Sequence, residues 1–156
     1  MKVVSDTSPI CYLVLVGQVD LLKTLFEQIS IPTAVRDELA HTGAPGAVRA
    51  WIAQPPAWLV IRTAPSDDRL GSLSRLHPGE REAILLATEM RSDLILLDDR
   101  AARRLAQERG LAVSGLLGLL SRAAREGRVS LPETLDRLRQ TNFRVAPRLL
   151  KAMLEA

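Results

Sequence analysis

The chain has 156 residues, a net charge of +3 and a single cysteine, which matches one ordinary domain and excludes an internal disulfide. No apolar run approaches the roughly 20 residues needed to span a bilayer and no secretion signal opens the sequence, so we expect a cytoplasmic protein without membrane contacts. Residues 1–99 carry 9 basic and 13 acidic side chains and residues 100–156 carry 12 and 5, so the C-terminal part either binds an anionic partner or only solvates its helix faces.

Short apolar runs alternate with helical patterns in the first part of the chain. Ser8 is a good N-cap, Pro9 is favoured in a first helical turn, and Gly17 breaks the helical pattern that follows. The expected elements, in chain order, are a strand at 3–4, a helical region at 10–26 interrupted near Gly17, a strand at 29–31, helices at 33–40 and 48–53, and a strand at 58–62.

The same alternation continues in the second part of the chain. Residues 94–97 are wholly apolar, which is typical of a strand that is buried on both faces. The expected elements are a short helix capped by Ser66-Asp67-Asp68 and ending at 76, a helix at 80–91, a strand at 94–97, a helix from Asp98-Asp99 to Gly110, a strand at 111–113, and helices at 116–126, 132–140 and 147–155.

Strands that alternate with helices predict an α/β fold. We expect a central parallel sheet of four to five strands with helices on both faces. The fold would be one domain over residues 1–156, with residues 131–156 as a helical C-terminal extension. In such sheets, ligands bind beyond the carboxyl ends of the strands.

Acidic residues occur where that rule places a binding site. They are Asp6 after the first strand, Glu38 on the helix after the second strand, Glu80 and Glu82 at the start of the helix before the fourth strand, and Asp98 and Asp99 after the fourth strand. Crowded carboxylates repel one another unless a positive charge lies between them. Mg²⁺ prefers oxygen ligands and activates water for attack on phosphorus, so this pattern indicates metal-dependent phosphodiester hydrolysis.

Most of these acids also have a purely structural explanation. Asp98 or Asp99 would suit the N-cap of the next helix, and Glu80 and Glu82 would suit a first helical turn. Asp6 is harder to explain in this way because Ser8 already supplies a cap. His41 and His77 lack the spacing of a zinc site, and the glycines match no nucleotide-binding loop.

Four blocks of the sequence together resemble the PIN-domain nucleases, and in particular the VapC-like toxins of prokaryotic toxin-antitoxin pairs. The blocks are Val3-Val4-Ser5-Asp6-Thr7-Ser8-Pro9, then Ile31-Pro32 with Val35 and Glu38-Leu39, then Leu76-His77-Pro78-Gly79-Glu80-Arg81-Glu82-Ala83-Ile84, and Ile95-Leu96-Leu97-Asp98-Asp99-Arg100. The resemblance implies a three-layer PIN-like fold and a Mg²⁺-dependent endoribonuclease, with Mn²⁺ as a substitute and one or two ions bound. Water would attack RNA in line and leave a 5′-phosphate and a 3′-hydroxyl.

The resemblance also assigns site residues. The catalytic, metal-binding acids would be Asp6, Glu38, Glu82 and Asp99, with Thr7 or Ser8 supporting them through a hydroxyl. Glu82 stands where many family members have aspartate, and Leu97 where many have threonine. Whether Glu80 or Glu82, and Asp98 or Asp99, faces the metal therefore stays open.

The expected partners follow from the charge pattern and the resemblance. Arg100, Arg103 and Arg104 begin beside the acids and would contact RNA phosphates. The family implies a homodimer and an antitoxin protein. Two alternatives are a non-catalytic PIN-like module that binds RNA or a partner, and a nuclease of RNA or DNA processing outside any toxin-antitoxin pair.

Overall fold

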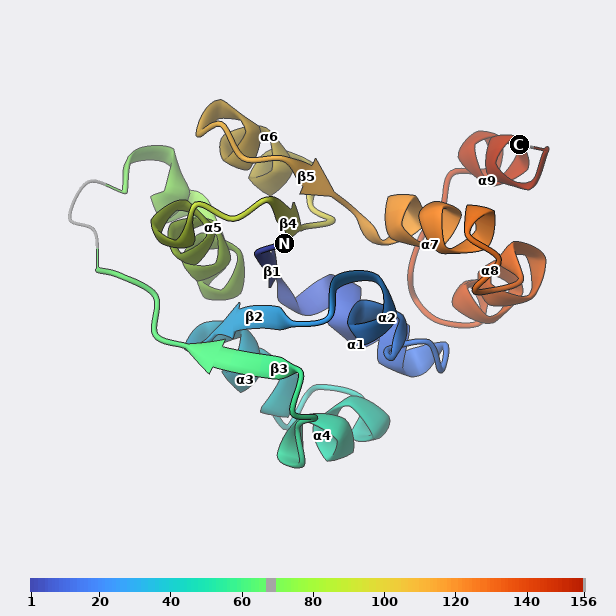
Figure 1. Cartoon of the computed structure of the whole chain (residues 1–156), viewed down its shortest axis with the longest axis horizontal. Helices are drawn as coiled ribbons and strands as arrows, with labels where there is room; N and C mark the ends of the chain where they lie inside the picture. Colours follow the sequence, from blue (N-terminus) through green and yellow to red (C-terminus); the bar gives the residue numbers. More distant parts are fainter. Residues whose placement is uncertain (67–69, 156) are drawn as a thin grey trace.

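Five parallel strands form the central sheet of the computed structural model, which describes residues 1–66 and 70–155 (Figure 1). They are β1 (Val3–Ser5), β2 (Ile29–Pro32), β3 (Leu59–Arg62), β4 (Leu94–Leu96) and β5 (Val113–Ser114). Their order is β3-β2-β1-β4-β5, so successive strands are added on one side of β1 and then on the other. The α/β class and the sheet of four to five parallel strands are therefore confirmed, and the topological switch point lies between β1 and β4.

The helices follow the expected order along the chain. They are α1 (Thr7–Leu15), α2 (Leu21–Phe26), α3 (Thr33–Ala40), α4 (Gly46–Ala53), α5 (Pro78–Met90), α6 (Arg100–Glu108), α7 (Leu116–Arg125), α8 (Leu131–Arg139) and α9 (Pro147–Glu155), with a 3₁₀ helix η1 at Gly71–Arg75. The helix expected before residue 76 is thus a 3₁₀ turn, and two residues of its expected cap, Asp67 and Asp68, lie outside the described residues.

The fifth strand begins later than the expected residues 111–113. Gly110 has a positive φ of 80°, and the backbone N–H of Leu111 still donates to the Ala106 carbonyl at 3.1 Å. Residues 110 and 111 therefore close the C-terminus of α6, because such left-handed caps satisfy the last helical carbonyls. Pairing with β4 starts only at Val113.

Alternating strand residues build two cores, one on each face of the sheet. Val3 and Leu96 pack into the core formed with helices α1 to α4, α7 and α8. Val4 and Ile95 pack into the core formed with η1, α5 and α6. Successive strand side chains point to opposite faces, so the predicted three-layer arrangement with helices on both faces is confirmed.

The helices of the C-terminal part lie on the side of the molecule away from α5 (Figure 1). In Figure 1, α7, α8 and α9 group together, away from α5. Leu135 and Leu138 of α8 are buried in the first core, whereas no residue of α9 is buried. The segment between α8 and α9 is tied to α1, because the Tyr12 hydroxyl donates to Asn142 Oδ1 at 2.6 Å.

The sequence also predicts that no segment spans a membrane. Among residues 1–66 and 70–155, no helix combines the length and the apolar character needed to cross a bilayer.

Candidate functional site

Asp6 occupies the switch point of the sheet. Its backbone N–H donates to the Leu96 carbonyl at 3.0 Å, which continues the pairing of β1 with β4 by one residue. The expectation that Ser8 caps the first helix is wrong, because α1 begins at Thr7 and its N-cap residue is Asp6. The Asp6 side chain makes no capping hydrogen bond. The side chain is 4% exposed, and its Oδ1 has no hydrogen-bond partner. A buried carboxylate oxygen without a partner is costly and calls for a functional explanation.

Three other carboxylates contribute to the raised pKa of Asp6. Burial raises the pKa of Asp6 to about 7, against the lowering effect of the Thr7 backbone N–H. The negative charges of Glu80, Glu38 and Asp98 raise this pKa further. These acids come from α5, from α3 and from the end of β4, so the fold gathers groups from distant parts of the sequence around one buried aspartate.

Glu38 is held against the start of α5. The Thr7 hydroxyl donates to Glu38 Oε1 at 2.9 Å, while Glu38 Oε2 is buried without a partner. A Cβ on Gly79 would lie 2.7 Å from Glu38 Oε1 and closer still to Oε2. Glu38 therefore occupies a space that only a glycine at position 79 leaves open.

Glu80 and Glu82 point to different neighbours. Glu80 Oε1 accepts from the His77 backbone N–H at 3.2 Å. Burial raises the pKa of Glu80, and the charges of Asp99 and Glu38 add to this effect, whereas His77 opposes it. The Glu82 Oε1 atom instead accepts from the Ala34 backbone N–H at 3.2 Å.

A second contact fixes Glu82 at the same place. The Thr33 hydroxyl donates to Glu82 Oε1 at 3.4 Å. Thr33 and Ala34 form the first turn of α3, whose N-cap position is Pro32, a residue without a capping side chain. Glu82 therefore satisfies the N-terminus of α3 from outside, because the first N–H groups of a helix need an acceptor.

Asp98 and Asp99 also divide into two roles. Asp98 Oδ1 accepts from the Leu116 backbone N–H at 2.7 Å, while Asp98 Oδ2 is buried without a partner. Burial raises the pKa of Asp98, and the Leu116 N–H, the Ser8 hydroxyl and the Arg103 guanidinium oppose this effect. Asp99 is exposed and caps α6, since its Oδ2 accepts from the Ala102 backbone N–H at 2.9 Å.

The structure thus draws together a set of acids that differs in two members from the set that the resemblance implies. We call this set, Asp6, Glu38, Glu80 and Asp98, the acidic cluster. It contains both alternatives that the sequence left open, Glu80 and Asp98, because their charges raise the pKa of Asp6. All four of these alternative acids accept from a backbone N–H at a helix start, so this contact alone does not separate them. Within residues 1–66 and 70–155, no three His, Cys, Asp or Glu side chains are grouped closely enough to form a metal site on their own.

The donor chemistry of the acidic cluster nevertheless fits a divalent cation. Asp6 Oδ1, Glu38 Oε2 and Asp98 Oδ2 are buried oxygens without hydrogen-bond partners. Mg²⁺ keeps several waters when it is bound, so these three carboxylates can hold an ion in part through its waters and need not all be adjacent to one another. A cation would also offset the two effects that raise the pKa of Asp6, which are first its burial and then the charges of the neighbouring acids.

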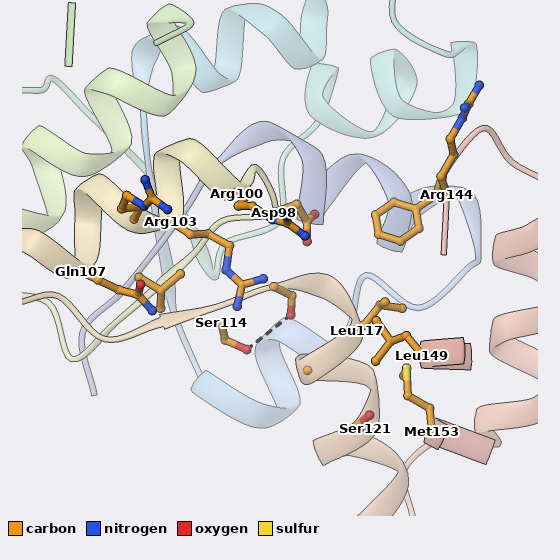
Figure 2. Close-up of a pocket in the computed structure, with 15 residues that line it drawn as sticks. Asp98, Arg100, Arg103, Gln107, Ser114, Leu117, Ser121, Arg144, Leu149 and Met153 are labelled. Carbon is orange, nitrogen blue, oxygen red and sulfur yellow. Dashed lines mark hydrogen bonds between the residues drawn. The ribbon is translucent and has the colours of Figure 1, made fainter. Parts of the chain in front are cut away.

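A pocket of about 850 Å³ opens beside Asp98, between α6, β5, α7 and the C-terminal segment (Figure 2). We call it the arginine pocket. Arg100, Arg103 and Arg104, which were expected to contact phosphates, all line it. Gly115 keeps this corner open, because a Cβ there would lie 2.9 Å from Asp98 Oδ1 and 3.3 Å from Arg103 Nη1. Residues missed from the sequence also line it, including Gln107, Ser114, Phe143 and Arg144.

A second pocket of about 820 Å³ is lined by one member of the acidic cluster, Glu38. Thr7, Glu38 and Glu82 line it together with residues of the loop that follows α3, such as His41 and Pro45. Each of the two pockets is thus lined by one member of the acidic cluster, Asp98 in the first and Glu38 in the second.

Comparison with known proteins identifies one family. The model of the family DUF3368, described as a PIN domain, matches residues 2–156. Comparison with curated proteins and with solved structures gives no match. The matched range includes every member of the acidic cluster and the whole C-terminal segment.

Proposed function

Because the chain belongs to the PIN-domain family over residues 2–156, we propose that it is a nuclease that hydrolyses RNA phosphodiester bonds with Mg²⁺ or Mn²⁺. One observation carries this proposal. Asp6, which is 4% exposed, lies under the influence of three further carboxylates and has a pKa raised to about 7. Such a group is costly to fold unless a ligand compensates it, and perturbed carboxylates in a cleft are typical of catalytic sites.

Three members of the acidic cluster are the proposed metal ligands. Asp6, Glu38 and Asp98 each present a buried oxygen without a partner, and Glu80 completes the negative field around them. One or two divalent ions held there would neutralise charge on the phosphate and assist the attack of water.

The other side chains near the cluster orient its acids and bind substrate. The Thr7 hydroxyl holds Glu38, and the Leu116 backbone N–H holds Asp98. The Ser8 hydroxyl also favours the ionised form of Asp98. In the proposed reaction, water adds to phosphorus while the bond to the 3′ oxygen breaks, which leaves a 5′-phosphate and a 3′-hydroxyl. Arg100, Arg103 and Arg104 would bind the phosphates on either side.

We propose a positioning role for Glu82 and Asp99 in place of the ligand role that the resemblance implies. Glu82 accepts from the first turn of α3, the helix that carries Glu38. Asp99 accepts from the first turn of α6, the helix that carries the arginines. Each acid thus sets the position of a helix that borders the cluster.

The cellular role is proposed from the resemblance to VapC-like toxins. The protein would be one domain that acts in the cytoplasm as the toxin of a toxin-antitoxin pair, with an antitoxin protein as partner and a homodimer as its assembly. Exposed apolar side chains on α9, Leu149 and Leu154, offer surface for such contacts and are 47% and 43% exposed.

Cleavage of a mixed RNA pool in the presence of Mn²⁺ tests the proposed function. The wild type should cut RNA and leave 5′-phosphate ends, EDTA should stop the reaction, and a single-stranded DNA pool should remain intact. Asp6→Asn should fold and lose roughly a hundredfold or more of the rate, as expected when one charged catalytic group is removed. Absence of cutting by folded wild type, or cutting that persists in EDTA, would contradict the proposal.

A further inference from the structure

The arginine pocket has a polar end and an apolar end. Figure 2 shows Arg103 and Ser114 at one end, close to Asp98, and Leu117, Leu149 and Met153 gathered at the other. Among residues 1–66 and 70–155, Asp98 is the one acid that lines the pocket. The polar end thus begins at the acidic cluster, and the apolar end lies farther along the C-terminal segment.

The charge of this pocket is strongly positive. Four arginines line it, Arg100, Arg103, Arg104 and Arg144. The ion pairs formed by residues 1–66 and 70–155 include none of these four guanidinium groups. Arg103 has one carboxylate nearby, that of Asp98, and its charge opposes the rise that burial causes in the pKa of Asp98. The positive charge of the pocket therefore exceeds its negative charge and attracts a polyanion, and the fork of N–H donors on arginine suits phosphate oxygens.

The C-terminal wall of the pocket is fixed relative to the acidic cluster. Phe143 is half-buried, and its ring meets the Tyr12 ring edge to face, with 4.9 Å between centroids and 72° between planes. The Tyr12 hydroxyl donates to Asn142 Oδ1. Tyr12 belongs to α1, the helix that begins directly after Asp6. Phe143, the residue before Arg144, is therefore packed against the helix that begins directly after the central acid.

We propose that the arginine pocket is a subsite for one nucleotide of single-stranded RNA that flanks the cleaved phosphate. The arginines of α6 at the polar end bind the phosphate on one side of this nucleotide, and Arg144 binds the phosphate on its other side (Figure 2). The base packs against Phe143, Leu149 and Met153. The pocket volume of about 850 Å³ suits a ligand of this size. The base must be unpaired, since a base that packs on protein side chains has left its helix. This inference rests on the proposed function and names the strand that the site accepts.

The alternative occupant of such a pocket is an acidic peptide with apolar residues. Continuity with the acidic cluster favours RNA, because Asp98 lines the pocket and also belongs to the cluster. A phosphodiester strand passes from the arginines directly to the site of hydrolysis.

Two substitutions in the C-terminal wall test the subsite without touching the acids. Arg144→Gln removes one guanidinium, and Phe143→Leu keeps an apolar group but removes the aromatic face. The matched control is Arg148→Gln, an exposed arginine on α9 that does not line the pocket. The probe is a short fluorescein-labelled single-stranded RNA in EDTA, and its binding is followed by fluorescence anisotropy.

Each wall variant should weaken RNA binding by about tenfold, the scale of one phosphate contact or one base stack. Arg144→Gln should also make the Kd for RNA less dependent on salt concentration. Arg148→Gln should bind as the wild type does. With Mn²⁺, the wall variants should raise KM more than they lower kcat. Thermal unfolding of all three variants should give a Tm close to that of the wild type, as expected if the fold is kept.

The subsite is wrong if both wall variants bind single-stranded RNA as tightly as the wild type, or if Arg148→Gln loses as much as they do. Pocket-dependent binding of a labelled acidic peptide in place of RNA would also overturn it. Failure of the nuclease proposal gives a different result. A wild type that never cleaves but still binds RNA through Phe143 and Arg144 would refute the catalytic proposal and support the subsite.

Discussion

The Glu38 carboxylate fills the space that a side chain at Gly79 would take, because a Cβ on Gly79 would lie 2.7 Å from Glu38 Oε1 and overlap the carboxylate. Gly79 has an ordinary helical conformation and no positive φ. Its small size therefore serves the Glu38 side chain and no special backbone geometry.

Gly79→Ala should displace the Glu38 carboxylate and abolish most RNA cleavage with little cost in stability. The free energy of unfolding should change by less than about 1 kcal/mol, because alanine favours a helix by about that amount over glycine and the displaced group is a flexible side-chain end. Cleavage rate and urea unfolding measure the two effects.

The matched control for this substitution is Gly46→Ala. Gly46 also lies in a first helical turn, and a Cβ there would meet nothing within 4 Å. This variant should cleave RNA at the wild-type rate. Equal activity of Gly79→Ala and the wild type would show that the position of Glu38 does not matter.

Asp98 and Asp99 should respond differently to the same substitution. Asp98→Asn removes a charge from the acidic cluster and should abolish cleavage. Asp99→Asn keeps a good N-cap for α6 and should leave most of the activity, whereas Asp99→Ala should cost about 1 kcal/mol of stability. Rates and unfolding free energies of the three variants check this assignment. Loss of cleavage in Asp99→Asn with retention in Asp98→Asn would reverse it.

These two neighbours show where sequence reasoning reaches its limit. The apolar run before them places both at the carboxyl end of β4, and the parallel sheet then brings them to Asp6. Consecutive residues of an extended chain point to opposite sides, so the choice between them depends on whether the chain has already turned into α6. Asp98 accepts from the distant Leu116 N–H, and Asp99 accepts from the nearby Ala102 N–H. The sequence alone does not show which of these two contacts each aspartate makes.

The choice between Glu80 and Glu82 has a similar cause. Two residues apart on a helix means about 200° of rotation, so the two side chains face nearly opposite ways. Packing of Ala83, Ile84 and Ala87 against the second core sets which way α5 is turned. The wall formed by Phe143 and Arg144 is harder still to predict, because it depends on two long-range contacts of Tyr12, one with Asn142 and one with Phe143.

Glu82 should therefore tolerate an uncharged isostere. Glu82→Gln keeps an oxygen that accepts from the Ala34 N–H and the Thr33 hydroxyl, so cleavage should stay within a few-fold of wild type. Glu80→Gln removes a charge that acts on Asp6 and should reduce cleavage much more. Steady-state rates with Mn²⁺ measure the contrast. A complete loss in Glu82→Gln would instead support the metal-ligand role implied by the family resemblance.

Asp6 should make stability depend on pH in a defined direction. Folding raises its pKa from the ordinary value of 3.8 to about 7. The contribution of Asp6 to stability is therefore fully present below about pH 4 and is lost as the pH rises through 7, where the buried carboxyl must ionise. Asp6→Asn removes this loss.

Urea unfolding in EDTA at about pH 5 and about pH 8 measures this difference. Asp6→Asn should gain stability over the wild type as the pH rises, by an amount on the order of a few kcal/mol at the upper pH. Glu80 and Asp98 also have raised pKa values, but both are present in the wild type and in Asp6→Asn. Their contributions therefore largely cancel in the difference between the two proteins. A difference that does not change with pH would show that Asp6 ionises normally in the folded state.

Mn²⁺ binding measured by calorimetry at about pH 8, above the pKa of Asp6, tests the central claim most directly. The claim is that Asp6, Glu38 and Asp98 hold a divalent ion. Wild type and Asp99→Asn should bind Mn²⁺, and Asp6→Asn and Asp98→Asn should bind it at least about tenfold more weakly. Folded wild type that takes up no Mn²⁺, or Asp6→Asn that binds it as tightly as the wild type, would contradict the account.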